Sequence, residues 1–315
     1  MPGAYAHLTM VNELGTRRNL ERLPGFTAQA AAAVAGRSEF LEMGAVSPDY
    51  PYLDLGSENA KRWADIMHYE GVGERIQAGI DFLHPRATNL DPAFRAAFAW
   101  FLGFVAHVTV DVSIHPVVEL KVGPYAQNAD RHRLCEMHQD AFIFRKLLNL
   151  GEIRDTEFID YGLRQCDEPH GSGRLSPSVI AIWDAMLRRT AGEYAANPPA
   201  FQTWHSRFLF IVDTVAEEAS RIPFLGRHMA EGGYSYPQAS YIDRQYIEDL
   251  EVPGGGRWGY QRIFEEAEKN VEEAWSRVAQ AVFEGDEAAR AYFQDVNLDT
   301  GRRLADGSLF YWRTA

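Results

Sequence analysis

Cysteine and strand-forming segments are scarce in this sequence of 315 residues. It contains only Cys135 and Cys166, too few for a disulfide framework in a chain of this length. Few segments show the alternation of apolar and polar residues that a half-buried strand requires. We therefore expect a fold without disulfide bonds and without a large sheet.

Positive charge is also in short supply. The sequence has 31 Lys and Arg against 44 Asp and Glu, which gives a formal net charge of −13. Such a chain repels the phosphates of DNA and RNA, so binding to nucleic acid is not expected. A bound metal ion can still attract a single phosphate, so this charge is compatible with an enzyme that acts on a phosphoester.

Signals for export and for membrane insertion are not visible either. Residues 1–7 contain no basic region followed by an apolar run, so we expect a cytoplasmic protein without a membrane anchor. The apolar stretch 96–106 is too short to cross a bilayer, because Asp111 interrupts it and about 20 apolar residues are needed. This stretch is apolar nearly all round, which is typical of a central helix.

Helical periodicity dominates the sequence and predicts an all-α fold. We expect one all-α domain over residues 1–315. Its first part, residues 1–150, holds the candidate metal ligands, and residues 151–315 form a helical C-terminal half.

Local signals predict the boundaries of several elements. Asp91 followed by Pro92 is a helix-cap signal at the start of the central helix. Residues 47–52 contain two prolines and are expected to form an extended loop. Residues 117–129 are expected to form a loop, and residues 240–315 are expected to be helical.

Two clusters of potential metal ligands lie on and after the central helix. His107, Asp111 and His115 are spaced four residues apart, which places them on one helix face, and His132 and Glu136 repeat this spacing. Such groups are costly to bury unless they are paired. Imidazole and carboxylate are usual ligands of zinc, so a metal cluster explains the pattern. The alternative is a set of hydrogen-bonded His–Asp pairs without a metal.

Together with three earlier residues, these five resemble the zinc-dependent phospholipase C family over roughly the first 140 residues. The earlier residues are His7 before an apolar run, Asp49 between two prolines and His68 in the segment 63–69. The family shares its fold with fungal single-strand-specific nucleases. The resemblance implies an all-α, multi-helix bundle with a buried cluster of two or three zinc ions.

The resemblance also implies which residues hold each zinc. The first zinc would be held by Asp49, His68, His107 and Asp111. The second would be held by His115, His132 and Glu136. His7 and Asp111 would help to hold a third, with Asp111 bridging. Secreted relatives complete the third position with an N-terminal Trp, which this chain does not have.

The implied activity is hydrolysis of a phosphoester by metal-activated water, with Asp49 orienting or deprotonating that water. A phosphodiester such as a phospholipid headgroup is the expected substrate, and the expected partner is a small or lipid-like phosphoester. Three alternatives stay open. They are a nuclease or other small-molecule phosphoesterase on the same frame, a biosynthetic enzyme or lyase that uses the zincs as Lewis acids, and a non-catalytic protein stabilised by metal. The oligomeric state is not indicated.

Three further side chains lie close to these ligands in the sequence. His138 and Asp140 follow Glu136 and are interpreted as solvated helix positions, with a role beside the ligands as the alternative. Cys135 lies on a different face of the same predicted helix and is interpreted as a packing residue.

Overall fold

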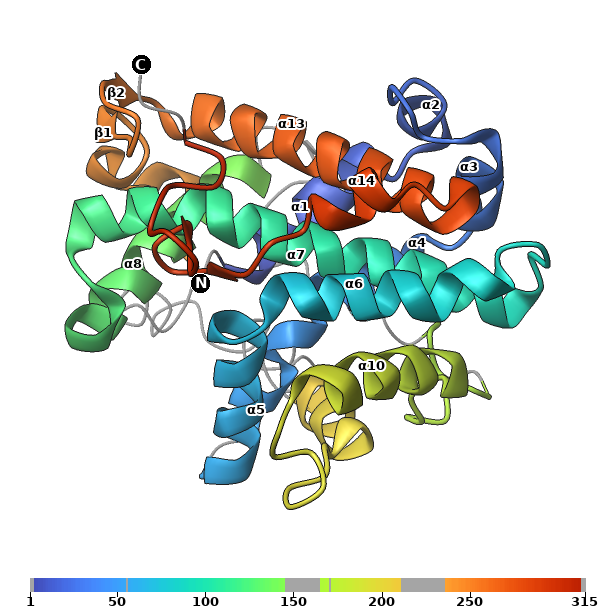
Figure 1. Cartoon of the computed structure of the whole chain (residues 1–315). Coiled ribbons are helices and arrows are strands. Elements are labelled where there is room, and N and C mark those ends of the chain that lie inside the picture. Colours follow the sequence, from blue (N-terminus) through green and yellow to red (C-terminus); the bar gives the residue numbers. More distant parts are fainter. Residues whose placement is uncertain (1–2, 55, 145–164, 170, 211–235, 313–315) are drawn as a thin grey trace.

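The computed structural model describes residues 3–54, 56–144, 165–169, 171–210 and 236–312 (Figure 1). Helices make up most of these residues, and the strands form two short hairpins. The all-α fold expected from the sequence is therefore confirmed.

Between residues 3 and 144, the described residues form helices joined by short connections, without strands. In chain order they are α1 (Ala4–Leu14), α2 (Arg17–Leu20), α3 (Ala28–Val34), α4 (Ser38–Val46), the 3-10 helix η1 (Ser47–Leu53), α5 (Glu58–Tyr69), α6 (Val72–Leu83), η2 (His84–Arg86), α7 (Pro92–Val122) and α8 (Tyr125–Ile143).

The C-terminal part adds helices and the two hairpins. It contains α10 (Pro177–Thr190), a helical stretch at 201–210, η4 (Ala239–Tyr241), η5 (Arg244–Tyr246), β1 (Leu250–Glu251), β2 (Arg257–Trp258), α13 (Tyr260–Ala279), the π-helical turn η6 (Gln280–Glu284), α14 (Glu287–Ala291), β3 (Val296–Asn297) and β4 (Arg302–Arg303). Strand β1 pairs antiparallel with β2, and β3 pairs antiparallel with β4.

Helix α7 runs through the middle of the molecule, with α4 and α13 packed along it (Figure 1). By length and composition it could cross a membrane, but its most apolar window is completely buried inside the structure. The sequence prediction that its apolar run is too short was therefore wrong, and burial is what identifies α7 as a core helix. The residues that it carries are consequently held in the interior.

Both ends of α7 have identifiable causes. The side chain of Asp91 accepts a hydrogen bond from the N–H of Phe94, and Pro92 occupies the first turn, as the sequence predicted. The helix ends at Gly123, which has a φ of 92°. Residues 117–122 are helical and not a loop, because burial of their apolar side chains outweighs the missing N–H of Pro116.

Two other sequence predictions were wrong. Residues 47–53 form η1 and not an extended loop, since Pro48 fits the first turn of a helix and Tyr50 is buried. Residues 240–315 are helical in α13 and α14, but they also contain both hairpins. These hairpins have strands of two residues, too short to produce a periodic pattern.

Helices α4 and α7 approach closely through two glycines. A Cβ on Gly103 would lie 2.1 Å from the carbonyl oxygen of Leu41, and one on Gly44 would lie 1.9 Å from that of Trp100. Only glycine permits this backbone contact. It brings the end of α4, and the start of η1 beyond it, against the middle of α7.

Candidate metal centre

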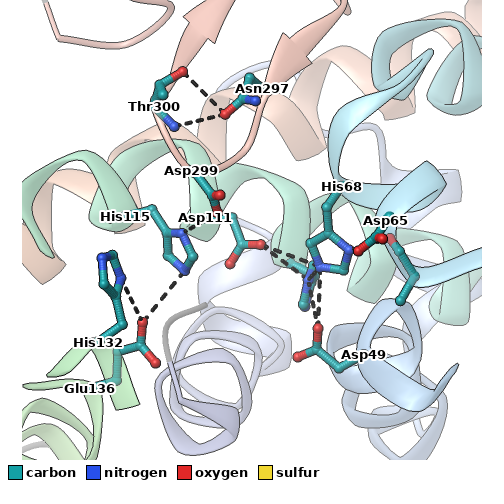
Figure 2. A network of polar contacts seen from close by, with 12 residues as sticks. Asp49, Asp65, His68, Asp111, His115, His132, Glu136, Asn297, Asp299 and Thr300 are labelled. Atoms are coloured by element: carbon teal, nitrogen blue, oxygen red, sulfur yellow. Dashed lines mark hydrogen bonds and ion pairs between the residues drawn. The ribbon is translucent and has the colours of Figure 1, made fainter. Parts of the chain in front are cut away.

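Five elements bring the predicted ligands together. Helix α1 carries His7, η1 carries Asp49, α5 carries His68, α7 carries His107, Asp111 and His115, and α8 carries His132 and Glu136. Seven of the eight residues are buried, and the eighth, Asp49, has a side chain that is 20% exposed. The side chains form two groups, with Asp111 lying between them (Figure 2).

The first group surrounds one face of α7. The Nε2 atom of His68 lies 3.2 Å from Asp49 Oδ1, and the Nε2 atom of His107 lies 3.3 Å from Asp111 Oδ2. The two Nε2 atoms lie 3.3 Å from each other. Ligand atoms of His68, His107 and Asp111 all lie within 4.8 Å of one another, as do those of His7, Asp49 and His107. Such spacing suits a shared metal ion.

The carboxylate of Asp111 faces ligands with both of its oxygens. Its Oδ1 atom lies 3.3 Å from His7 Nε2, and its Oδ2 atom lies 3.3 Å from His107 Nε2 and 3.8 Å from His68 Nε2. The ring of His7 stacks on that of His107, with centroids 4.2 Å apart. His7 therefore joins the first group from the other side of Asp111.

The second group lies one helical turn further along α7. His115 Nε2 and His132 Nδ1 each lie 3.8 Å from Glu136 Oε1 (Figure 2). Three ligand atoms thus converge, which is the number that a catalytic zinc site takes from protein.

Hydrogen bonds fix which nitrogen of His68, His107 and His132 faces its group. The Nδ1 atoms of His68 and His107 contact the carbonyl oxygens of Ala64 (2.7 Å) and Ala45 (2.8 Å). The Nε2 atom of His132 contacts the carbonyl oxygen of Gly123 at 2.6 Å. A carbonyl accepts a hydrogen bond, so the contacting nitrogen carries the proton. When the ring is neutral, its other nitrogen points into the group with the lone pair that metal binding requires.

Several atoms that face the two groups have no hydrogen-bond partner. Among the described residues, the buried atoms with no hydrogen-bond partner include both nitrogens of His7, Oδ1 of Asp49, both oxygens of Asp111, Nε2 of His115 and Nδ1 of His132. Buried polar atoms normally have partners, because an unpaired one costs about 1–3 kcal/mol. The donor set and its geometry therefore fit zinc.

In the first group, neighbouring carboxylates and imidazoles shift one another's pKa values. Burial alone would raise the pKa of Asp111, but His107, His7 and His115 hold that pKa well below its usual value. Burial alone would lower the pKa of His107, but Asp111 and Asp49 raise it to about 9. The metal-free group therefore carries a proton on His107 at neutral pH, and a metal ion must displace that proton.

The comparison with known families agrees with this geometry. The family model of zinc-dependent phospholipase C matches residues 6–193. The chain belongs to the zinc-dependent phospholipase C family. Searches of curated proteins and of solved structures found no match. Membership in the family supports a zinc-dependent hydrolase of the phospholipase C type that acts on phosphoesters.

One residue beside the ligands was missed in the sequence. Asp299, in the turn between β3 and β4, places its Oδ1 atom 3.1 Å from His115 Nδ1. It lies 184 residues after His115 and outside the span matched by the family of zinc-dependent phospholipases C. The local signal is the turn sequence Asn-Leu-Asp-Thr-Gly at 297–301, which predicts a tight turn but not its neighbours.

The neighbours of Glu136 on α8 are not solvated, contrary to the sequence interpretation. Asp140 is buried and accepts hydrogen bonds from the N–H groups of Tyr5 (3.2 Å) and Ala6 (2.9 Å), so it caps the first turn of α1. His138 is buried as well, and its Nδ1 accepts a hydrogen bond from the N–H of Asp243. Cys135 is a buried free thiol, as its interpretation as a packing residue predicts.

Proposed function

We propose that this protein hydrolyses a phosphodiester, such as a phospholipid headgroup, at a centre of two or three zinc ions. The zinc-dependent family supports the reaction class. The two overlapping His/Asp clusters of the first group, and the separate convergence of His115 and His132 on Glu136, support more than one metal position. The substrate class, the number of zinc ions and the roles of individual residues go beyond what family membership alone supports.

The position of Asp111 is the observation that carries the proposal. Its two oxygens face different histidines, His7 on one side and His107 on the other, and its side chain is fully buried. A carboxylate in this position can bind one metal ion with each oxygen. Neighbouring metal ions suit a phosphodiester, because one oxygen must attack the phosphorus while another leaves it.

Asp49 is the candidate for handling the proton of the attacking water. Zinc, when bound, supplies Lewis acidity that activates water near neutral pH and stabilises negative charge on a phosphate. Burial alone would raise the pKa of Asp49, but His107 and His68 lower it, so its carboxylate is ionised at neutral pH. Its side chain is 20% exposed, whereas those of His68, His107 and Asp111 are at most 1% exposed. Asp49 is therefore placed to meet a substrate, and its ionised carboxylate can accept a hydrogen bond from the attacking water and orient it.

The test combines metal analysis with a substrate panel. Purified protein is assayed for zinc and then for cleavage of phosphatidylcholine vesicles, bis(p-nitrophenyl) phosphate, p-nitrophenyl phosphate and a single-stranded oligonucleotide. We expect cleavage of the diesters, little cleavage of the monoester, and loss of activity on chelation with recovery on adding zinc. Asp49→Asn should lower kcat by roughly 10²-fold or more, the usual contribution of a proton-transfer group.

Asp65→Asn is the matched control, since Asp65 is also partly exposed and lies near His68 but contacts Tyr52 and not the ligand groups. Its kcat should stay close to that of the parent. Faster cleavage of the oligonucleotide than of any other diester would favour the nuclease alternative. A protein that is loaded with zinc and cleaves none of the four substrates would overturn the proposal.

A further inference from the structure

The turn between β3 and β4 contacts both ligand groups. Asp299 Oδ1 lies 3.1 Å from His115 Nδ1 in the second group. The adjacent residue, Leu298, donates its backbone N–H to the carbonyl oxygen of His68 in the first group, at 3.2 Å. Figure 2 shows Asp299 reaching from this turn toward His115. A short C-terminal segment thus lies against ligands on α5 and on α7.

His115 is anchored differently from the other ligand histidines whose anchors are described. His68, His107 and His132 each contact a main-chain carbonyl, whereas His115 contacts a carboxylate. With its Nδ1–H donated to Asp299, the ring presents Nε2 toward Glu136 Oε1, 3.8 Å away. A carboxylate partner fixes the ring and also makes its free nitrogen a stronger ligand.

Several contacts hold the turn in place. Asn297 Oδ1 accepts hydrogen bonds from the N–H (3.0 Å) and the hydroxyl (3.2 Å) of Thr300. Gly301 has a φ of 65°, and a Cβ there would lie 2.7 Å from Pro116 Cγ on α7. A larger residue would be strained and would push the turn away from α7. The position of Asp299 is therefore set by its own turn and by close packing on α7.

We propose that Asp299 is a positioning residue for the second ligand group, and that the β3–β4 turn completes a metal centre whose ligands all lie in the first half of the chain. Asp299 acts through His115, by holding its ring and strengthening its Nε2 as a zinc ligand. The inference rests on the metal centre of the proposed function but not on its substrate.

A purely structural role for Asp299 predicts different behaviour. Asp295, four residues earlier, provides the comparison, because its Oδ1 accepts hydrogen bonds from the N–H groups of Gly73 (2.9 Å) and Glu74 (3.2 Å) at the start of α6. Asp295→Asn weakens the attachment of the same segment without touching a ligand. It should lower the melting temperature and leave zinc affinity unchanged.

The experiment measures zinc affinity by competition with a chromophoric chelator, and zinc content by elemental analysis. We expect Asp299→Ala to lower the affinity for the most affected zinc ion by about 10–100-fold, the usual effect of removing such a partner. Asp299→Asn keeps an oxygen that can accept the Nδ1–H and should recover part of this loss. In a His115→Ala background, Asp299→Ala should cause little further loss, because the residue through which it acts is gone.

The outcomes separate the inference from the proposed function. If the parent protein binds no zinc, the metal centre itself is wrong. If the parent binds zinc and Asp299→Ala binds it with unchanged affinity, or behaves like Asp295→Asn, the positioning role is refuted. Equal losses from Asp299→Ala in the parent and in the His115→Ala background would also refute it.

Discussion

The ligand residues owe their geometry to groups that bind no metal. The carbonyl oxygen of Ala45, at the end of α4, anchors His107, and that of Ala64 anchors His68. A ring held at one nitrogen loses little further freedom when the other binds a metal, which favours tight binding. The centre is therefore preorganised by the backbone of neighbouring helices.

Removing Asp111 should remove metal and stability together. Asp111→Ala deprives His7 and His107 of a common partner, and we expect loss of zinc together with about 3–5 kcal/mol of unfolding free energy. Denaturant unfolding and elemental analysis measure the two effects.

His205→Ala is the control for burial alone. His205 is as buried as Asp111, and its Nε2 lies 3.1 Å from Asp167 Oδ1, away from the ligand groups. This variant should lose stability to a similar extent and keep the zinc content of the parent. An Asp111→Ala protein with full zinc content would contradict the assignment of Asp111 as a ligand.

The raised pKa of His107 makes the metal-free protein sensitive to pH. The pKa is about 9 in the folded chain against an ordinary 6.5, so the protonated ring contributes stability in full below pH 6.5. This stability should be lost as pH rises through 9. Melting temperatures of chelator-treated protein between pH 6.5 and 9.5 should therefore fall more steeply for the parent than for His107→Gln. Equal slopes for the two proteins would refute this assignment of the proton.

The sequence was sufficient to find the eight candidate ligands but not Asp299. Residues such as His107, Asp111 and His115 share a face of any α-helix that contains them, so their spacing alone predicts that they lie close together. Asp299 approaches His115 only because a turn far along the chain packs on α7, and no local pattern encodes that contact.

At the scale of elements, the crossing of α4 and α7 sets the position of the first group. The contact at Gly103 lies one helical turn before His107, and the Ala45 carbonyl that anchors His107 follows the Gly44 contact directly. A change in the distance between these helices must therefore move the ligand as well as the core.

Gly103→Ala should separate these helices. The added Cβ meets the carbonyl oxygen of Leu41 at 2.1 Å and the amide nitrogen of Ala45 at 2.8 Å. We expect a loss of about 1–3 kcal/mol in unfolding free energy, typical of overpacking, and weaker zinc binding. Gly192→Ala, where a Cβ meets nothing within 4 Å, should change stability by at most about 0.5 kcal/mol and leave zinc binding intact. Unchanged zinc affinity in Gly103→Ala would show that the crossing does not control the site.

The elements that the sequence predicted poorly are those governed by distant packing. The last turns of α7 pass through Pro116, which predicts a helix end, yet Val117, Val118 and Val122 are buried and keep the chain helical. Strands β3 and β4 are two residues long; β3 packs against α5 and α6, and the turn after it packs on α7 through Gly301. Local propensity decides such segments only when tertiary contacts do not.

At the scale of the whole molecule, three polar candidate ligands lie on a long, largely apolar helix. Helix α7 is almost completely buried, yet it contributes His107, Asp111 and His115 to the interior. In the described part of the chain, both oxygens of Asp111 and Nε2 of His115 are buried without a hydrogen-bond partner. Metal binding and global stability should therefore be coupled.

Chelation should destabilise the entire protein and not only its site. A ligand present at 1,000 times its Kd stabilises the folded state by about 4 kcal/mol, so unfolding midpoints with zinc and with chelator should differ accordingly. Denaturant titrations followed by circular dichroism measure this difference. It should be smaller in Asp111→Ala, which keeps only the ligands of the second group intact. Superimposable curves for the parent with and without chelator would mean that the fold does not depend on metal.

The anchors of the histidines also differ in how easily mutation can remove them. The acceptors at Ala45, Ala64 and Gly123 are main-chain carbonyls, which every amino acid possesses, so no codon change at these positions deletes them. The acceptor at Asp299 is a side chain, and one base change converts an aspartate codon to one for alanine, asparagine or glycine. Among these four anchors, the one that a single base change can delete therefore lies far along the sequence from the histidine that it holds.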